Sequence, residues 1–210
     1  MRTKCFSVLV LLLSLQFGYG QDTSNHVNFM NIPDEVIKKE IAFFSKKSKL
    51  LGYSERASNL KEVHPYICSD SLVSFNFRST YINLFLKEMS EGGQIDSLIS
   101  GLSWGACSKP TTRVGSLSVV THSKFGVKIP LSSVSGLYEP HIFENTKKKL
   151  FSWWKKRPFS AFYKVFTSLD KRRTYIYMLG GQEGHKYEVT WVIRGSTYLY
   201  RVIDDLVSEN

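Results

Sequence analysis

The chain has 210 residues and carries 28 lysines and arginines against 18 aspartates and glutamates, for a net charge of +10. This length can form one well-buried domain or two small ones. There is no internal repeat, no low-complexity tract and no long Pro/Gly/Ser-rich linker, which excludes a repeat protein and favours a single domain over residues 33–210.

Residues 1–20 have the pattern of a secretory signal peptide. Two basic residues precede an apolar run from Phe6 to Leu15, and the small residues Gly18 and Gly20 occupy the two cleavage-determining positions. The apolar run is about half of the roughly twenty residues that a membrane-spanning helix needs. We therefore expect cleavage before Gln21 and a secreted or periplasmic protein.

Cleavage would leave two cysteines, Cys68 and Cys107, in an oxidising compartment. They allow one intramolecular disulfide, which would close a loop of about forty residues and stabilise the fold by roughly 3–4 kcal/mol. Two buried free thiols are the alternative. The cysteines are far apart, and neither His64 nor His122 stands at zinc-motif spacing, so we expect no metal site. No cofactor is expected either.

Residues 21–32 are polar and are expected to be loose. A helix is predicted from Pro33 to Leu51, because apolar residues recur there at helical spacing. Asp34 and Glu35 lie in its first turn and three lysines lie near its end, which suits the helix dipole. This helix would bury one apolar face against a core.

The middle of the chain changes from helical to strand patterns. A helix is predicted from Ser79 to Met89, where Ile82, Leu86 and Met89 recur at helical spacing, and a second short helix over 94–102. From Thr112 we expect two strands, the second alternating through residues 125–129 and ending at Pro130.

Pro140 to Arg157 is predicted to form another helix, with proline in its first turn and Pro158 just past its end. Its apolar residues fall on about half of the circumference and its lysines on the other half. The predicted helix is therefore amphipathic and basic.

The C-terminal third has the clearest strand pattern. Three segments rich in aromatic and β-branched residues, 175–179, 187–193 and 198–203, are separated by glycines, and 159–167 could add a strand before them. Gly180 to Gly184 is expected to be a hairpin connection. In 187–193 one side of the strand has Tyr187, Val189, Trp191 and Ile193, and the other has Glu188, Thr190 and Val192, which predicts a sheet with one side facing water.

Helices followed by mostly antiparallel strands indicate an α+β domain, with a twisted antiparallel sheet packed on helices. This element order is similar to the layout of cystatin-like and nuclear-transport-factor-like folds, in which a curved sheet wraps over helices. The similarity is one of layout and implies no particular activity.

The positive charge is concentrated between Lys147 and Arg173, where ten basic residues and one acid give a local net charge of +9. The rest of the mature chain is close to neutral. Aromatic residues interrupt the basic ones, so this segment could form a cationic aromatic face for an anionic surface or polymer. The candidate binding residues are Lys147, Lys148, Lys149, Trp153, Trp154, Lys155, Lys156 and Arg157. The alternative is that both tryptophans pack in a core while the lysines are merely solvated.

Other residues give weak indications of chemistry. No pair of histidines has metal-binding helical spacing. Asp204 and Asp205 would point to opposite faces of a strand, so they are expected to be a polar chain end and not an acid–base pair. Ser103 stands in a Gly-x-Ser-x-Gly sequence, but a predicted helix precedes it where a nucleophile elbow needs a strand.

Three functions remain open at this point. The first is an exported, non-enzymatic binding protein that engages lipid headgroups, lipopolysaccharide or acidic polysaccharide, with nucleic acid less favoured. The second is a small extracytoplasmic hydrolase or ligand-pocket protein, with a cavity lined by tyrosines and Trp191. The third is an interaction subunit that binds a protein partner through Trp153 and Trp154.

Overall fold

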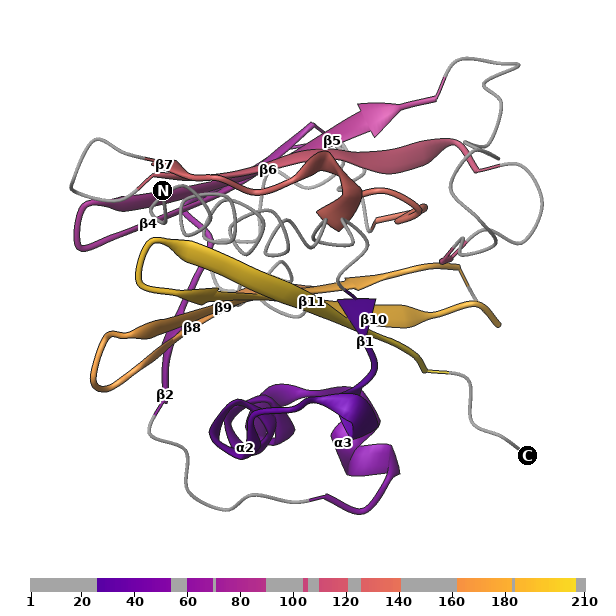
Figure 1. The fold of residues 1–210 in the computed structure, drawn as a ribbon. Coiled ribbons are helices and arrows are strands. Elements are labelled where there is room, and N and C mark those ends of the chain that lie inside the picture. Colours follow the sequence, from indigo (N-terminus) through magenta and orange to yellow (C-terminus); the bar gives the residue numbers. More distant parts are fainter. Residues whose placement is uncertain are drawn as a thin grey trace, which may run out of the picture.

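Strands form two sheets that stack face to face, and helices cover the outer face of one of them (Figure 1). Sheet A is the middle layer, which lies between the helices and the second sheet, and we name that second sheet sheet B. The structure is a computed structural model, and the residues that it describes are 26–53, 60–69, 71–89, 104–105, 110–120, 126–140, 162–182 and 184–206.

Sheet A is built mainly from the C-terminal part of the chain. Its strands in spatial order are β1 (His26–Val27), β11 (Thr197–Asp205), β10 (Tyr187–Arg194), β9 (Arg173–Gly180), β8 (Tyr163–Ser168) and β2 (Leu60–Val63). From β8 to β11, each strand pairs antiparallel with the next along the chain. The four strands predicted in this region are confirmed, and so is the hairpin connection after Gly180.

Sheet B comes from the middle of the chain. Its strands in spatial order are β3 (Ile67–Cys68), β4 (Leu72–Phe77), β5 (Thr80–Glu88), β6 (Thr112–Val120) and β7 (Gly126–Val127). All four pairings are antiparallel. The strand predicted from Thr112 is confirmed as β6, whereas the next one, β7, is shorter than predicted.

The helix predicted from Ser79 to Met89 was wrong, because this segment forms β5. Ile82, Leu84 and Leu86 are buried at every second position, which is the period of a strand. The intervening Phe85 is exposed. The second helix predicted after this segment, over 94–102, lies outside the described residues.

Large side chains fill the space between the two sheets. Tyr163, Tyr187 and Trp191 from sheet A are fully buried against residues of sheet B such as Phe75 and Leu84. The indole Nε1 of Trp191 donates a hydrogen bond to the carbonyl oxygen of Ser133 at 2.8 Å. Ser133 belongs to the short 3-10 helix η2 (Leu131–Ser133), which this bond ties to sheet A.

The opposite face of sheet A is covered by the N-terminal helices (Figure 1). These are the 3-10 helix η1 (Phe29–Asn31) and the α-helices α2 (Glu35–Phe44) and α3 (Lys46–Leu50). Phe44 of α2 stacks on Phe166 of β8 with ring centroids 4.2 Å apart. Sheet A is therefore buried on both faces, and the predicted water-facing side was wrong.

The predicted α+β fold class is also wrong. The cystatin-like or nuclear-transport-factor-like layout has one sheet wrapped over helices, but this chain stacks two sheets and adds two short helices to one of them. The physical reason is that β5, read as a helix, pairs with β4 and β6 and so completes a second sheet with its own apolar face.

The helix predicted from Pro33 to Leu51 is divided at Ser45, which has the extended conformation with φ −62° and ψ 139°. The carboxylate of Glu188 in β10 accepts hydrogen bonds from the Ser45 hydroxyl and from the backbone N–H groups of Lys46 and Lys47. These bonds from another element satisfy the start of α3, so the chain can bend while keeping α2 and α3 on the sheet.

The start of the described chain is more ordered than predicted. His26 and Val27 form a parallel pair with β11. The backbone N–H of Phe29 donates to both carboxylate oxygens of the buried Asp204, at 3.2 and 3.0 Å. The prediction of a loose segment is therefore wrong for residues 26–31, and Asp204 is part of the packing between β11 and η1.

Candidate functional site

Most of the residues predicted to bind an anion lie outside the part of the chain that the structure describes. This holds for Lys147, Lys148, Lys149, Trp153, Trp154, Lys155, Lys156 and Arg157, as well as for Ser103. Cys68 lies in β3, and its predicted disulfide partner Cys107 lies outside the described residues. These predictions stay predictions.

The end of the basic segment is described, and its charges have different surroundings. Lys164 forms an ion pair with Glu62 at 3.2 Å, and Arg173 binds Glu40 through Nε and Nη2 at 2.7 and 2.9 Å. Lys171 and Arg172 are exposed on the loop between β8 and β9. Neither has an ion pair with a carboxylate among the described residues.

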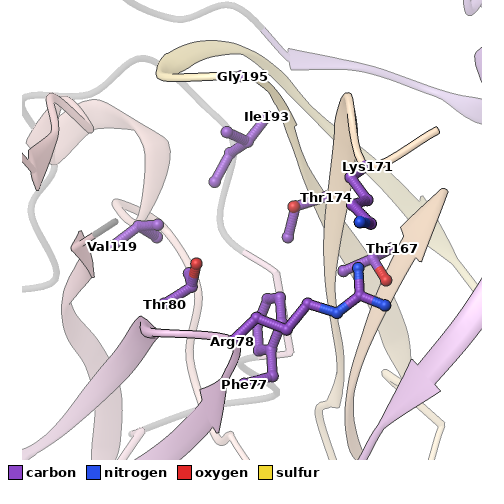
Figure 2. Close-up of a pocket in the computed structure, with 9 residues that line it drawn as sticks. All are labelled: Phe77, Arg78, Thr80, Val119, Thr167, Lys171, Thr174, Ile193 and Gly195. Atoms are coloured by element: carbon purple, nitrogen blue, oxygen red, sulfur yellow. The ribbon is translucent and has the colours of Figure 1, made fainter. Parts of the chain in front are cut away.

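Lys171 lines a cleft at one end of the two stacked sheets. Three connections meet at this end: the β4–β5 turn of sheet B, and the β8–β9 and β10–β11 connections of sheet A (Figure 1). The cleft has a volume of about 300 Å³. Its lining residues, shown in Figure 2, are Phe77, Arg78, Thr80, Val119, Thr167, Lys171, Thr174, Ile193 and Gly195.

Two cations from opposite sheets converge in this cleft. The Arg78 side chain extends from the β4–β5 turn toward Thr167, and Lys171 enters the same side from sheet A (Figure 2). In the described part of the chain, Arg78 also lacks a carboxylate partner. Two like charges that face each other without a counter-ion repel, so an anion between them is favoured.

The acid next to Lys171 is engaged elsewhere. The carboxylate of Asp170 accepts hydrogen bonds from the Ser168 hydroxyl and from the backbone N–H of Arg172, and lies 3.6 Å from Nη2 of Arg173. The Ser168 hydroxyl, helped by the Arg172 N–H, lowers the pKa of Asp170, which is therefore ionised at neutral pH. Its hydrogen-bond partners hold it on its own loop.

The backbone holds both cations in conformations that are costly for their residue types. Arg78 and Ser79 have φ of 46° and 63°, and Lys171 has φ of 60°. Phe77 pairs with Thr80, so Arg78 and Ser79 are the two central residues of a tight hairpin, for which Asn-Gly is the preferred sequence. Strained residues of this kind concentrate at functional sites.

The rest of the cleft is a mixture of hydroxyl groups and apolar surface. Thr167 and Thr174 are cross-strand neighbours on β8 and β9, and Thr80 faces them from sheet B. Val119 and Ile193 belong to the core between the sheets and are almost fully buried. The cleft is therefore apolar where it meets the core and polar at its mouth.

Sequence reasoning missed Arg78 and found Lys171 only as one member of a long basic stretch. The sequence did contain a signal for Arg78. Two runs rich in apolar and aromatic residues are separated only by Arg78 and Ser79, which is the length of a two-residue hairpin turn. The signal was weak because the pair contains neither glycine nor asparagine. The spacing of residues along the sequence gives no sign that sheets A and B bring the two cations together.

The residues proposed to line a ligand pocket have a structural role. Trp191 and Tyr187 are fully buried in the core between the sheets, and the Tyr187 hydroxyl donates to the carbonyl oxygen of Tyr138 at 3.0 Å. Tyr177, on the helix-facing side of sheet A, donates its hydroxyl to Glu188 at 2.9 Å. These side chains fill interior space, and the cleft lies elsewhere.

Asp204 and Asp205 are on opposite faces of β11, as predicted for adjacent strand residues. Asp204 is buried beside Glu188, its cross-strand neighbour, whereas Asp205 is exposed. Burial raises the pKa of Asp204 to about 6 although the Phe29 N–H opposes this rise. The predicted polar chain end was therefore wrong for Asp204, and the two acids do not face one substrate.

Among the described residues, His, Cys, Asp and Glu side chains do not gather in a group of three or more that could hold a metal ion. In the same ranges, no helix is long and apolar enough to cross a bilayer. Comparisons with known protein families, with curated protein sequences and with solved structures found no match to this chain.

Proposed function

We propose that the protein is an exported, non-enzymatic binding protein, and that it holds an anionic group in the cleft between Arg78 and Lys171. The observation that carries this proposal is the convergence of two cations from opposite sheets without a carboxylate partner among the described residues. Export is inferred from the signal-peptide pattern of residues 1–20.

The surroundings of the two cations support binding more than catalysis. The lining residues contribute hydroxyl groups from three threonines, but no histidine, cysteine or carboxylate that could act as nucleophile, acid or base. Arg172, the next residue of the same loop, is exposed but does not line the cleft. Residues 147–157 stay a predicted further contact for the same kind of partner, whether a lipid headgroup, lipopolysaccharide or an acidic polysaccharide.

The proposal is tested by titrating the ¹⁵N-labelled protein with inorganic phosphate at low ionic strength and following its amide chemical shifts. We expect saturable shifts at the β4–β5 turn, at Lys171 and at Gly195. Arg78→Gln and Lys171→Gln should each raise the Kd about five- to tenfold, because each removes one charged hydrogen-bond donor. Raising the salt concentration should weaken binding in the parent protein.

The matched control is Arg172→Gln, which removes the same charge from the neighbouring position of the same loop but outside the cleft lining. Its Kd should stay within about twofold of the parent value, since a side chain that does not line the cleft makes no direct hydrogen bond to the anion and acts on it only through screening solvent. Equal losses in all three variants, or shifts spread evenly over the basic surface, would show that phosphate senses only the net charge and would contradict the proposal.

A further inference from the structure

The cleft is divided into a charged side and an apolar side, and this division indicates its ligand class. In Figure 2, Lys171, Thr167 and the end of the Arg78 side chain stand on one side, and Val119 and Ile193 on the other. Building on the proposed function, we infer that the ligand is a single-tailed anionic amphiphile. Its head group binds between the two cations, and its alkyl tail lies along the apolar side.

The apolar side of the cleft ends on the core between the two sheets. Val119 is 2% exposed and Ile193 is 1% exposed, and both belong to the cluster of buried residues between sheets A and B. Phe77, half-buried beside the turn, packs against the same cluster. A tail placed there would rest mainly on the exposed part of Phe77, with Val119 and Ile193 at the floor of the cleft, and its burial is favourable in proportion to the apolar area covered.

The polar groups of the cleft argue against a ligand with a polar body. A sugar or a nucleobase would need hydrogen-bond partners for several groups deep in the cleft. Among the lining residues, the uncharged polar side chains are Thr80, Thr167 and Thr174, and none of the lining residues is Asp, Glu, Asn, Gln or His. The hydroxyl groups suffice for the oxygens of one head group but would leave a polyhydroxylated body unpaired.

The volume of the cleft sets the size of the ligand. About 300 Å³ accommodates roughly ten water-sized groups at about 30 Å³ each. A phosphate, sulfate or carboxylate head takes about four of these. The remaining six or so groups correspond to a tail of about six carbons, and longer tails would extend beyond the cleft.

The test measures the Kd of monoalkyl phosphates, from methyl to dodecyl phosphate, by isothermal titration calorimetry at fixed ionic strength. Each compound is kept below its critical micelle concentration. Affinity should rise about three- to fourfold per methylene and should level off after about six carbons. An uncharged alkyl glucoside with the same tail should bind far more weakly than the phosphate.

The result separates this inference from the proposed function. If inorganic phosphate and methyl phosphate bind at Arg78 and Lys171 but the Kd does not change with tail length, the amphiphile inference is wrong while the anion site stands. If no member of the series binds at these residues, both are wrong.

Variants of the apolar side provide a second readout. Val119→Thr keeps the shape of the side chain but replaces a methyl group by a hydroxyl, so the gain per methylene should fall while the Kd for inorganic phosphate stays the same. Phe77→Thr is the alternative if Val119→Thr does not fold, since Phe77 is only half-buried. A gain per methylene that is unchanged in a folded variant of either kind would overturn the placement of the tail.

The amphiphile could reach the protein free in solution or from a membrane. Sedimentation with phosphatidylcholine vesicles that contain lysophosphatidic acid, a single-tailed phosphate lipid, with and without octyl phosphate as competitor, distinguishes the two sources. Pelleting that octyl phosphate abolishes identifies a lipid head group presented by the bilayer as a ligand. Binding of octyl phosphate without vesicle pelleting identifies a free amphiphile.

Discussion

The turn residues of the cleft provide a prediction in which stability and binding change in opposite directions. Arg78, Ser79 and Lys171 have φ of 46°, 63° and 60°. An L-residue in this region costs about 1–2 kcal/mol, and glycine avoids that cost but loses about 0.5–1 kcal/mol through its freedom in the unfolded chain. Replacing any one of these three residues by a residue that tolerates positive φ should therefore stabilise the fold by about 0.5–1 kcal/mol.

The variant Arg78→Asn/Ser79→Gly/Lys171→Gly replaces all three residues and gives the hairpin its preferred Asn-Gly turn. Its free energy of unfolding, measured by urea denaturation, should exceed that of the parent by about 2 kcal/mol. The same variant should no longer bind phosphate in the amide-shift titration, because both cations are gone. Such a result would mean that the chain keeps a strained turn for the sake of binding.

Lys61→Gly is the matched control, because Lys61 is an exposed lysine in the extended strand β2. Glycine there should destabilise the fold by up to about 1 kcal/mol, since no strain is relieved. The reasoning is refuted if Lys171→Gly destabilises as much as Lys61→Gly, or if the triple variant binds phosphate as well as the parent does.

Three further predictions concern the packing of sheet A. The pKa of Asp204 is raised from 3.8 to about 6, so its proton stabilises the folded chain at low pH, and this stabilisation of about 3 kcal/mol is lost as the pH rises through 6. The free energy of unfolding of Asp204→Asn, relative to the parent, should therefore rise by about 2 kcal/mol between pH 4 and pH 7, because the unfolded carboxyl is already partly ionised at pH 4. That of the exposed Asp205→Asn should stay flat, and a flat difference for Asp204→Asn would contradict the prediction. Glu188→Ala should lower the free energy of unfolding by about 3–5 kcal/mol in urea denaturation, because four hydrogen-bond donors lose their acceptor. Glu188→Gln should lower it less, and an equal loss of stability in both variants would contradict the role of this network. Gly180→Ala should destabilise the fold by about 3 kcal/mol in the same assay, because the added Cβ would lie 2.5 Å from the Tyr187 ring. Unchanged stability would show that the ring can move away.

The sequence by itself determined those strands whose residue pattern is compatible with only one kind of secondary structure. β9, β10 and β11 were predictable because aromatic and β-branched residues alternate between glycine-rich turns, and consecutive strands then pair through short connections. The segment that forms β5 permits two interpretations. Ile82 and Leu86 are compatible with a helical period and also with a period of two, and the hydrogen bonds from β4 and β6 selected the strand.

Polar residues of sheet A were misread for a related reason. Glu188 and Thr190 indicate a water-facing side when only β10 is considered. In the folded chain they are buried under the helices, because Glu188 supplies the hydrogen bonds that begin α3. A carboxylate that serves another segment cannot be distinguished from a solvated one by local pattern.

The sequence alone therefore determined the excess of basic charge, the C-terminal strands and the apolar face of the first helix, because these depend on composition and on neighbours along the chain. Tertiary structure decided which charges stay unpaired. Lys164 and Arg173 form ion pairs with carboxylates of β2 and α2, whereas Lys171 and Arg78 line one cleft between the two sheets. The physical reason is that a charge interacts through distance and dielectric surroundings, and both are set by strand pairing between segments far apart in the sequence.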